Sequence, residues 1–406
     1  MKKNSLAYYG GKKVIDKKLS YRKLFGKEEL KKVEEVFRYS WKIKKDFGFQ
    51  EIFEDKFTKS FSKFMGGGYT DAVSSGGAAL YIALKALNIS KNSEIIISPV
   101  CNPGGIMPLA IQEFNFVIAD SGENTFNVTP ETFKKAISKK TKVAVLTHLG
   151  GIPVDVETIS KICKKNKILL IEDCSQAHGA IINKKKVGSF GIISTFSTMW
   201  SKTLATGGCG GIIFTKKKHY YNKIRSIADR GKPFHNKNFN FKDTHKYLFP
   251  SLNFNSDEIS CAIGSSILKK LPNIINKRFL IANKIKNSIE KSKSLCILDN
   301  YSKNFKPSFF FLTIYFKKDF RFNKKLFIKA IESEGVTING NYKDIVSEWI
   351  WVKKSKNFRI INKSKNAINY RNNSFNLLFN ENFSNKDIFL ILKAILKVEN
   401  YFLKIY

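Results

Sequence analysis

The sequence lacks the features that mark secreted, metal-binding and membrane-spanning proteins. It has six cysteines, and none of them forms a CxxC pair or a zinc-ligand spacing. The N-terminal residues contain no apolar signal core, and no apolar run approaches the ~18 residues that a membrane span needs. Internal repeats and disordered linkers are absent as well. We therefore expect reduced, mostly buried thiols, no bound metal and a cytoplasmic protein.

Acidic residues are scarce: 33 aspartates and glutamates stand against 71 lysines and arginines, which gives a formal net charge of +38. Such an excess invites a nucleic-acid interpretation, because basic patches neutralise phosphate groups. The lysines are spread along the whole chain, however, and only short runs such as 184–186 and 216–218 stand out. Lys, Asn, Ile and Phe are abundant together, a combination typical of AT-rich coding. We therefore favour coding bias over nucleic-acid binding, although the positive field could help to attract a phosphorylated substrate.

Length and apolar content predict a large α/β protein. The 406 residues suit two subdomains, and 43% hydrophobic with 13% aromatic residues is typical of globular rather than disordered chains. Strand-like and helix-like patterns alternate, which predicts a mainly parallel sheet covered by helices. The expected strands cover residues 71–74, 94–98, 116–119, 143–147, 167–171, 212–214 and 309–315. The expected helices cover residues 27–39, 52–64, 78–84, 155–165, 324–334 and 385–398.

One lysine, Lys202, stands in a position suited to covalent chemistry. It follows an apolar, strand-like segment and precedes the glycine-rich stretch 207–211, where the backbone can approach a ligand closely. A lysine that reacts with a carbonyl cofactor must be partly desolvated so that its pKa falls. Taken alone, Lys202 is more simply interpreted as one of many solvated lysines.

An acidic residue upstream favours the reactive interpretation of Lys202 over the solvated one. The apolar run 167–171 is followed by Glu172 and Asp173, and α/β folds place ligand-binding groups at the carboxyl ends of buried parallel strands. Pyridoxal phosphate needs a carboxylate against its pyridinium nitrogen so that the ring withdraws electrons. Asp173 fits that role, and together with Lys202 it points to this cofactor.

The turn after the expected strand at 71–74 suits a phosphate group. Ser75, Gly76 and Gly77 lead into the helix at 78–84, so that free backbone N–H groups and the positive end of the helix dipole meet there. An ordinary tight turn between a strand and a helix shows the same pattern. The residues alone leave both interpretations open.

Five stretches, taken as a set, are specific for one family. They cover residues 75–80, 148–151, 172–179, 187–191 and 196–211. In order and spacing they resemble the fold-type-I, pyridoxal-phosphate-dependent sugar aminotransferases of the DegT/StrS type. The resemblance implies an α/β PLP-transferase fold, with a mainly parallel, seven-stranded-type sheet in a large domain and a smaller α/β domain. The implied division is an N-terminal arm or helical segment at 1–50, a large cofactor-binding domain at 51–270 and a small C-terminal domain at 271–406.

The resemblance implies roles for the residues already singled out. Lys202 would be the Schiff-base lysine and the general acid/base. Asp173 would contact the pyridinium nitrogen of the cofactor. Gly76, Gly77 and Ser197 would hold the cofactor phosphate.

Two further residues, and three departures from the family pattern, follow from the resemblance. Gln176 would lie beside the ring oxygen of the cofactor, and Asn253 would reach the cofactor phosphate of the other subunit. Relatives usually carry threonine at the position of Gly77 and arginine at that of Asn255. Relatives often carry an aromatic residue that stacks on the cofactor near the position of Pro103, which leaves the stacking partner open here.

The C-terminal third contains one more candidate region. Residues 339–351 include several aromatic side chains that could border a substrate pocket. Packing in a hydrophobic core is the commoner reason for such aromatics, and we favour that interpretation.

The resemblance implies a transaminase that works in two half-reactions. The amino donor would be L-glutamate and the acceptor a keto group of a nucleotide-linked (deoxy)sugar, for surface-polysaccharide or glycoconjugate biosynthesis. Two subunits would share their active sites in a homodimer. Some relatives carry histidine in place of the lysine and act as dehydratases, so Lys202 favours aminotransfer. The alternatives are a cyclitol or other non-nucleotide ketone as acceptor, a cofactor-binding protein that does not transaminate, and a basic nucleic-acid binder on the same scaffold.

Overall fold

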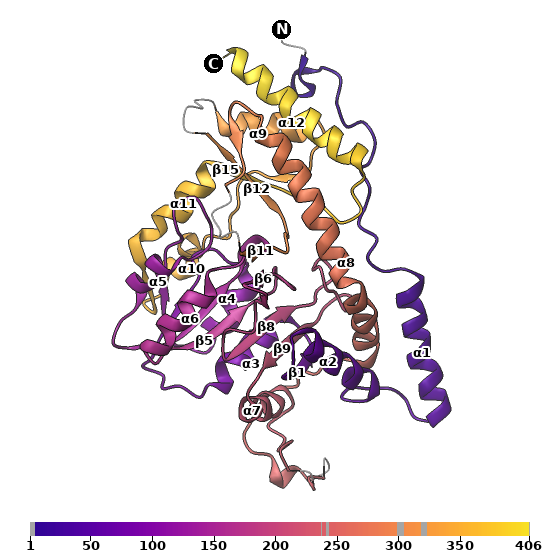
Figure 1. The fold of residues 1–406 in the computed structure, drawn as a ribbon. Helices are drawn as coiled ribbons and strands as arrows, with labels where there is room; N and C mark the ends of the chain where they lie inside the picture. The colour runs from indigo at the N-terminus through magenta and orange to yellow at the C-terminus, as the bar shows by residue number, and fades with distance from the viewer. Residues whose placement is uncertain (1–4, 237, 241–242, 299–303, 318–322, 406) are drawn as a thin grey trace.

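Most of the expected strands lie in one central sheet of eight strands (Figure 1). The structure is a computed structural model, and it describes residues 5–236, 238–240, 243–298, 304–317 and 323–405. In spatial order the strands are β1 (Tyr69–Val73), β9 (Gly211–Thr215), β8 (Ile193–Ser197), β5 (Leu169–Asp173), β4 (Thr141–Thr147), β2 (Glu94–Ile97), β3 (Asn115–Ile118) and β14 (Phe358–Ile360). β9 pairs antiparallel with β1 and with β8, and every other neighbouring pair is parallel. The mainly parallel sheet predicted for a PLP-transferase fold is confirmed.

Helices cover both faces of this sheet, as an α/β architecture requires. One hydrophobic core lies between the sheet and one set of helices: α2 (Ile52–Phe64), α5 (Pro130–Ala136), α6 (Val156–Lys165) and α8 (Glu258–Ile289). A second core lies against the other face, under α3 (Gly76–Ala86), α4 (Pro103–Ala110), α7 (Lys218–Ala228) and α10 (Ile350–Lys354). Because the central strands are covered on both faces, they read as continuous apolar runs rather than as alternating patterns.

Helix α2 shows how the sequence pattern produces this packing. Phe53, Phe57 and Phe61 recur every four residues, lie on one side of the helix and are buried. The carboxylate of Glu258, at the start of α8, accepts hydrogen bonds from the backbone N–H groups of Phe53 (2.7 Å) and Glu54 (3.1 Å). These are unpaired donors of the first helical turn, so α8 caps α2 as well as covering it.

A smaller antiparallel sheet follows at the opposite end of α8. It pairs β10 (Leu295–Cys296), β12 (Leu312–Phe316), β15 (Ser374–Leu377) and β13 (Ile338–Asn339) in that order. The end of α8 packs on this sheet together with α9 (Lys324–Ser333) and α12 (Asn385–Ile405). A three-stranded sheet of β11 (Phe305–Lys306), β6 (Ile181–Ile182) and β7 (Lys185–Lys186) lies between the two larger sheets in Figure 1. The expected small C-terminal α/β unit is present.

The N-terminal segment that precedes α1 (Lys27–Ile43) lies along the smaller sheet's helices, so both chain ends meet at one end of the molecule (Figure 1). Ala7 and Val14 each donate a backbone N–H to the carboxylate of Glu334 (2.9 Å each). Ser20 donates its hydroxyl to Asp387 (2.7 Å). The residues before α1 are therefore an arm that is tied to the C-terminal part of the chain, and we call residues 6–22 the N-terminal arm.

Several features depart from the sequence-based expectation. The eighth strand, β14, comes from the C-terminal third and adds to the edge of the central sheet beside β3. Helix α4 starts at Pro103, in a segment with no predicted helix, and α11 (Lys365–Asn372) is a further helix of the C-terminal third. Helix α8 runs without a break across residues 270 and 271, the expected domain boundary. The division into 1–50, 51–270 and 271–406 stays a prediction.

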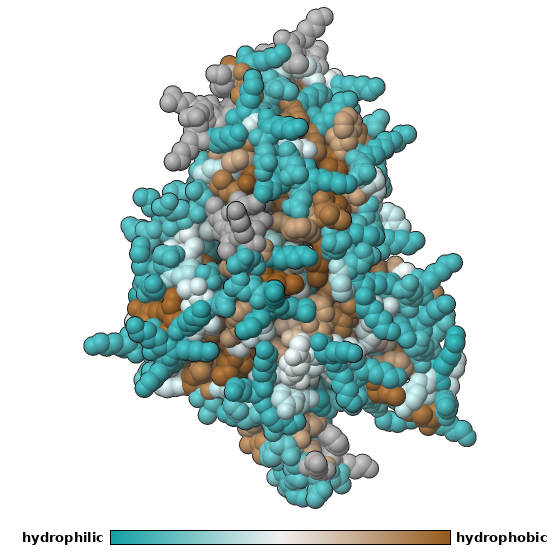
Figure 2. Space-filling view, viewed as in Figure 1, coloured by the Kyte–Doolittle hydropathy of each residue, from teal (hydrophilic) through white to brown (hydrophobic). Residues whose placement is uncertain are grey.

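Hydrophilic side chains cover most of the face shown in Figure 2, with apolar patches between them. Among the described residues, no helix combines the length and the apolar content that crossing a membrane would require.

Candidate active site

A cavity of about 310 Å³ lies where the carboxyl ends of parallel strands meet the first turns of α3 and α4. This is the position at which open α/β sheets bind ligands. Asn253 is the one predicted site residue outside the cavity wall. The predicted residues in the wall are Gly76, Gly77, Asp173, Gln176, Ser197 and Lys202.

Lys202 lies in the turn that follows β8. Its backbone N–H donates to the carbonyl of Met199 (2.9 Å), and the residue is only 9% exposed. Burial lowers the pKa of the amine, and the nearby acidic groups, Asp173 first among them, oppose that shift. The Nζ atom also lies 4.9 Å from the centre of the Phe310 ring. This is the partly desolvated amine that chemistry with a carbonyl group requires.

Asp173 ends the central strand β5 and is 3% exposed. One carboxylate oxygen accepts the backbone N–H of Ser175 (3.1 Å), and the other accepts the hydroxyl of Thr147 (3.3 Å). These two donors fix the orientation of the carboxylate at the cavity wall. The negative charge is therefore held in place on the same cavity as the amine of Lys202.

The turn before α3 forms a cradle of backbone donors. Ser75 caps the helix by accepting the N–H of Ala78 with its side chain (3.0 Å), so the preceding glycines present their N–H groups to the cavity. A Cβ atom on Gly76 would lie 2.6 Å from the Cβ of Ser197. Only glycine fits there while Ser197 stays at the wall. The close approach of the two backbones places the Gly76 N–H group and the Ser197 side chain side by side at the cavity.

The departure at Gly77 has a local explanation. A Cβ atom at this position would lie 3.2 Å from the ring carbon Cγ of Pro108 in helix α4. A threonine, as relatives usually carry, would crowd that proline. Glycine at position 77 therefore leaves room for the proline inside α4, at the expense of the threonine hydroxyl.

Gln176 follows β5 and is held by hydrogen bonds. Its Oε1 atom accepts the backbone N–H of Gly150 (2.8 Å), and its side chain also hydrogen-bonds the hydroxyl of Tyr342. Tyr342 contacts the rings of Phe126 and Phe311 as well. Part of the region 339–351 therefore reaches the site, so the interpretation of its aromatics as core alone is too narrow.

Pro103 stands next to residues of the cavity wall in the sequence, and the residue that stacks on the cofactor stays open. Pro103 is the first residue of α4 and is absent from the cavity wall, whereas its neighbours Asn102 and Gly104 are part of that wall. The side chain of Asn102 accepts the N–H of Gly104 (3.2 Å) and caps the helix. Asn102 and Gly104 thus contribute to this part of the cavity wall.

Asn253 lies on an exposed segment outside the cavity of its own chain. Its Oδ1 atom accepts hydrogen bonds from the backbone (3.1 Å) and the side chain (2.7 Å) of Asn255. Asn255 also accepts a hydrogen bond from Gln50 (2.7 Å). Asn253 therefore does not line the cavity of its own chain, and its role stays a prediction.

Three residues near Lys202 were not singled out from the sequence, because each lies far from it along the chain, although Asp344 falls within the candidate region 339–351. Arg22 of the N-terminal arm donates to the carbonyl of Lys202 (2.6 Å). Phe310 precedes β12 and places its ring beside the amine. Asp344 accepts the N–H of Cys101 with its carbonyl (2.9 Å), and its carboxylate interacts electrostatically with Lys202. No local pattern marks these residues, since only the fold brings them together.

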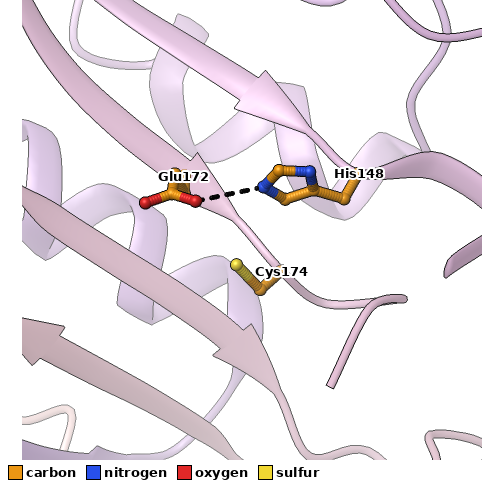
Figure 3. A group of neighbouring side chains, drawn as sticks. All are labelled: His148, Glu172 and Cys174. Atoms are coloured by element: carbon orange, nitrogen blue, oxygen red, sulfur yellow. Dashed lines mark hydrogen bonds and ion pairs between the residues drawn. The ribbon is translucent and has the colours of Figure 1, made fainter. Parts of the chain in front are cut away.

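A second cluster of polar groups consists of His148, Glu172 and Cys174, which do not line the cavity (Figure 3). Their ligand-type atoms lie within 4.8 Å of one another, but His148 and Glu172 already form hydrogen bonds within the protein. His148 accepts the N–H of Val154 (3.0 Å) at Nδ1, so its Nε2–H faces Glu172 (3.3 Å). Glu172 also accepts the N–H of Gly188 (2.7 Å), and burial raises the pKa of the Cys174 thiol well above its ordinary value. We interpret these hydrogen bonds as structural, because they connect the segments around β4 and β5 and leave His148 and Glu172 engaged without a metal ion.

Comparison with known proteins identifies the family. The DegT/DnrJ/EryC1/StrS aminotransferase family matches residues 24–396. The chain belongs to this family. It is 30% identical over 266 residues to GDP-perosamine synthase of Escherichia coli O157:H7, covering 66% of this chain and 69% of that protein. It is also 30% identical over 309 residues to GDP-4-keto-6-deoxy-D-mannose 3-dehydratase of E. coli O55:H7, covering 71% of this chain and 78% of that protein.

Solved structures agree on the fold of this aminotransferase-family chain. An aminotransferase from Psychrobacter cryohalolentis superposes with a TM-score of 0.86 at 24% identity, covering 95% of this chain and all of that one (100%). At that identity the likeness shows the fold alone. The family assignment identifies the chain as a PLP-dependent enzyme of the aminotransferase class.

The residues present fit pyridoxal phosphate. The cavity combines a buried lysine amine, a fixed carboxylate and a helix N-terminus at which Gly76 has room for no side chain. These are the three kinds of group that the aldehyde, the ring nitrogen and the phosphate of this cofactor need. Lys202, Asp173 and the Gly76–Ser197 pair would hold the cofactor.

Proposed function

We propose that this aminotransferase-family enzyme moves an amino group from L-glutamate to the keto group of a nucleotide-linked deoxy sugar, for surface-polysaccharide or glycoconjugate biosynthesis. The observation that carries the proposal is that Lys202 and Asp173 meet at one buried cavity. The substrate class is supported by the names of relatives, among them the GDP-perosamine synthase and a transaminase of dTDP-3-amino-3,6-dideoxy-α-D-galactopyranose.

Each residue has a defined task in this proposal. Pyridoxal phosphate, when bound, supplies a ring that takes up the electron pair released at a substrate carbon. Asp173 would hold a negative charge against the ring nitrogen. Lys202 would hold the cofactor at its aldehyde carbon, and its amine would accept a proton from the donor carbon. Ser197 and the first turn of α3 anchor the phosphate, so the reacting carbon stays within reach of Lys202.

Lys202 also separates aminotransfer from the dehydratase reaction of a relative. The 3-dehydratase is as similar in sequence as the perosamine synthase, so overall similarity does not choose between them. A lysine amine is a strong enough base, when buried, to take the proton from the donor carbon and to return it to the product carbon. The presence of Lys202 therefore favours aminotransfer.

The proposal is tested by visible absorption of the purified protein with pyridoxal phosphate, before and after L-glutamate. We expect a lysine-dependent band that L-glutamate bleaches and that a nucleotide-linked keto sugar restores. If glutamate left the band unchanged while another amino donor bleached it, the assignment of L-glutamate as the donor would be wrong. If only a cyclitol ketone restored the band, the assignment of a nucleotide-linked keto sugar as the acceptor would be wrong.

We further propose that the enzyme is a homodimer in which Asn253 reaches the partner subunit's cofactor phosphate. Three exposed apolar side chains lie near site residues in the sequence. Ile111 (70% exposed) caps the end of helix α4, Leu252 (64%) precedes Asn253, and Trp200 (63%) lies two residues before Lys202. Such groups are typical of a surface that a second subunit covers.

Mixed dimers test this arrangement. Asn253→Ala alone should weaken the affinity for pyridoxal phosphate about tenfold or more, because a hydrogen bond to a charged phosphate is lost. Refolding Lys202→Ala together with Asn253→Ala should restore activity, because one site of the mixed dimer would then receive both native residues. No recovery, with mixed dimers present by mass spectrometry, would mean that Asn253 acts within its own chain. The cytoplasmic location stays a prediction.

A further inference from the structure

A buried carboxylate links the C-terminal part of the chain to the loop that carries Lys202. Glu381 lies between β15 and α12 and is 7% exposed. Its Oε1 atom accepts Nε–H of Arg22 from the N-terminal arm (3.0 Å). Its Oε2 atom accepts Nη1–H of Arg278 from helix α8 (3.0 Å). One acidic group thus joins three segments that are far apart in the sequence.

The first arginine reaches the backbone of the lysine loop. Besides its bond to Glu381, Arg22 donates Nη1–H to the carbonyl of Trp200 (3.1 Å) and Nη2–H to that of Lys202 (2.6 Å). A guanidinium can make these bonds at the same time because its donors point in fixed, divergent directions. The Lys202 loop is therefore fastened to Glu381 through a single side chain.

The second arginine holds the ring that faces the amine. Arg278 donates Nε–H to the carbonyl of Phe309 (2.7 Å) and Nη2–H to that of Phe310 (2.8 Å). The Phe310 ring centre lies 4.9 Å from Nζ of Lys202. Glu381 thereby fixes the backbone of Lys202 on one side and the aromatic neighbour of its amine on the other.

The charge state of Glu381 suits this task. Burial raises the pKa of the carboxyl group, but Arg22 and Arg278 more than offset that effect, so the pKa lies below its ordinary value. The group is a carboxylate at neutral pH and satisfies both guanidiniums. Removing it would leave the buried Arg278 and the half-buried Arg22 without a shared counter-charge.

We propose that Glu381 is a positioning residue for Lys202, which acts through Arg22 and Arg278 to hold the amine and the Phe310 ring in one arrangement. The inference rests on the cofactor-binding role proposed for Lys202. A purely structural role is the alternative, in which Glu381 only ties the arm to the C-terminal part of the chain.

Glu334 offers a matched control for that alternative. It is fully buried (0% exposed) and also ties the arm to the C-terminal part, through backbone N–H groups of the arm and through Lys397 (2.7 Å). None of its bonds involves the Lys202 loop or Phe310. Glu381→Gln and Glu334→Gln therefore remove similar buried charges with different neighbours.

The first measurement uses the protein without added cofactor. Acetic anhydride labels lysine amines, and mass spectrometry compares Lys202 with the exposed Lys216 as an internal reference. Glu381→Gln should raise the labelling rate of Lys202 at least about fivefold, because the loop opens more often. Arg22→Lys should do the same, since it keeps the charge but loses the forked donors. Glu334→Gln should leave the rate unchanged.

The second measurement is the visible circular dichroism of the protein loaded with pyridoxal phosphate. The ratio of dichroism to absorbance should fall at least about twofold in Glu381→Gln and Arg22→Lys, and stay constant in Glu334→Gln. Equal changes in both glutamate variants, or no change in Arg22→Lys, would overturn the proposal. If the chain failed to bind the cofactor, the proposed function would fail, but the labelling rates would still decide the role of Glu381. If Glu381→Gln failed to fold, Arg22→Lys would carry the test.

Discussion

Lys202→Ala is expected to lower kcat for amino transfer by at least about 10³-fold, because proton transfer by a positioned amine alone contributes on the order of 10²–10⁴. Among the described residues, Lys202 is the only lysine of the cavity wall, so the same substitution also removes covalent attachment of the cofactor. The measurement is initial rate under saturating cofactor and donor, with product amine detected by mass spectrometry. Added methylamine should restore part of the rate, because it can take the place of the missing side chain.

Lys232→Ala is the matched control for this variant. Lys232 is another buried lysine (6% exposed), but its amine donates to Asp229 (2.6 Å) and it does not line the cavity. We expect this control to lose stability and to keep the lysine-dependent absorption. If Lys202→Ala retained more than a tenth of the wild-type kcat while Lys232→Ala lost it, the catalytic lysine would have been misassigned.

Asp173→Asn is the second substitution with a large expected effect. An amide has almost the same shape as the carboxylate but offers no negative charge to the ring nitrogen. Loss of one preorganised electrostatic group of this kind lowers kcat on the order of 100-fold or more. Cofactor binding should change much less, because Lys202 and the α3 cradle remain. Stopped-flow absorbance of the half-reaction with L-glutamate measures the effect on the chemical step directly.

Asp120→Asn provides the comparison for Asp173→Asn. Asp120 follows the parallel strand β3, is 2% exposed, and accepts hydrogen bonds from the side chain of Asn362 (2.8 Å) and the backbone of Asn366 (3.1 Å). It is absent from the cavity wall. We expect destabilisation with an unchanged half-reaction rate. Equal slowing in both variants would show that Asp173 matters for the fold and not for the ring nitrogen.

The sequence predicted those parts of the site that lie in short, continuous motifs. Lys202 and Asp173 each follow an apolar strand, and a buried parallel strand is recognisable from its own residues. Gly76 and Ser197 come from different stretches, and their contact follows only once both strands lie in one sheet. The family resemblance supplied that link, since local patterns leave the phosphate cradle and an ordinary turn equally possible.

The rest of the site depends on contacts between distant segments. Arg22 and Glu381 are 359 residues apart, yet they form one ion pair beside the Lys202 loop. Nothing in the neighbourhood of either residue marks that pairing, because charged side chains on this chain are abundant and mostly solvated. The same holds for β14, whose three residues gain their strand identity only from pairing with β3.

Pro103 illustrates a different limit. The alignment of motifs placed it near the cofactor ring, but a proline at the first helical position starts α4, and Pro103 is not part of the cavity wall. Asn102 and Gly104 line the cavity in its place. An alignment of motifs therefore predicts where a residue lies in the chain. It does not predict where the side chain points when a different residue type, here a proline, starts a helix at that position.

The most direct test of this account is to locate the lysine that binds pyridoxal phosphate. The protein is incubated with the cofactor, reduced with sodium borohydride, digested and mapped by mass spectrometry. Because this chain carries so many lysines, chance labelling would spread over many peptides. The account predicts that the reduced cofactor is found at Lys202 in near-stoichiometric amount. Stoichiometric labelling of a different lysine, or no fixed label at any position, would contradict it.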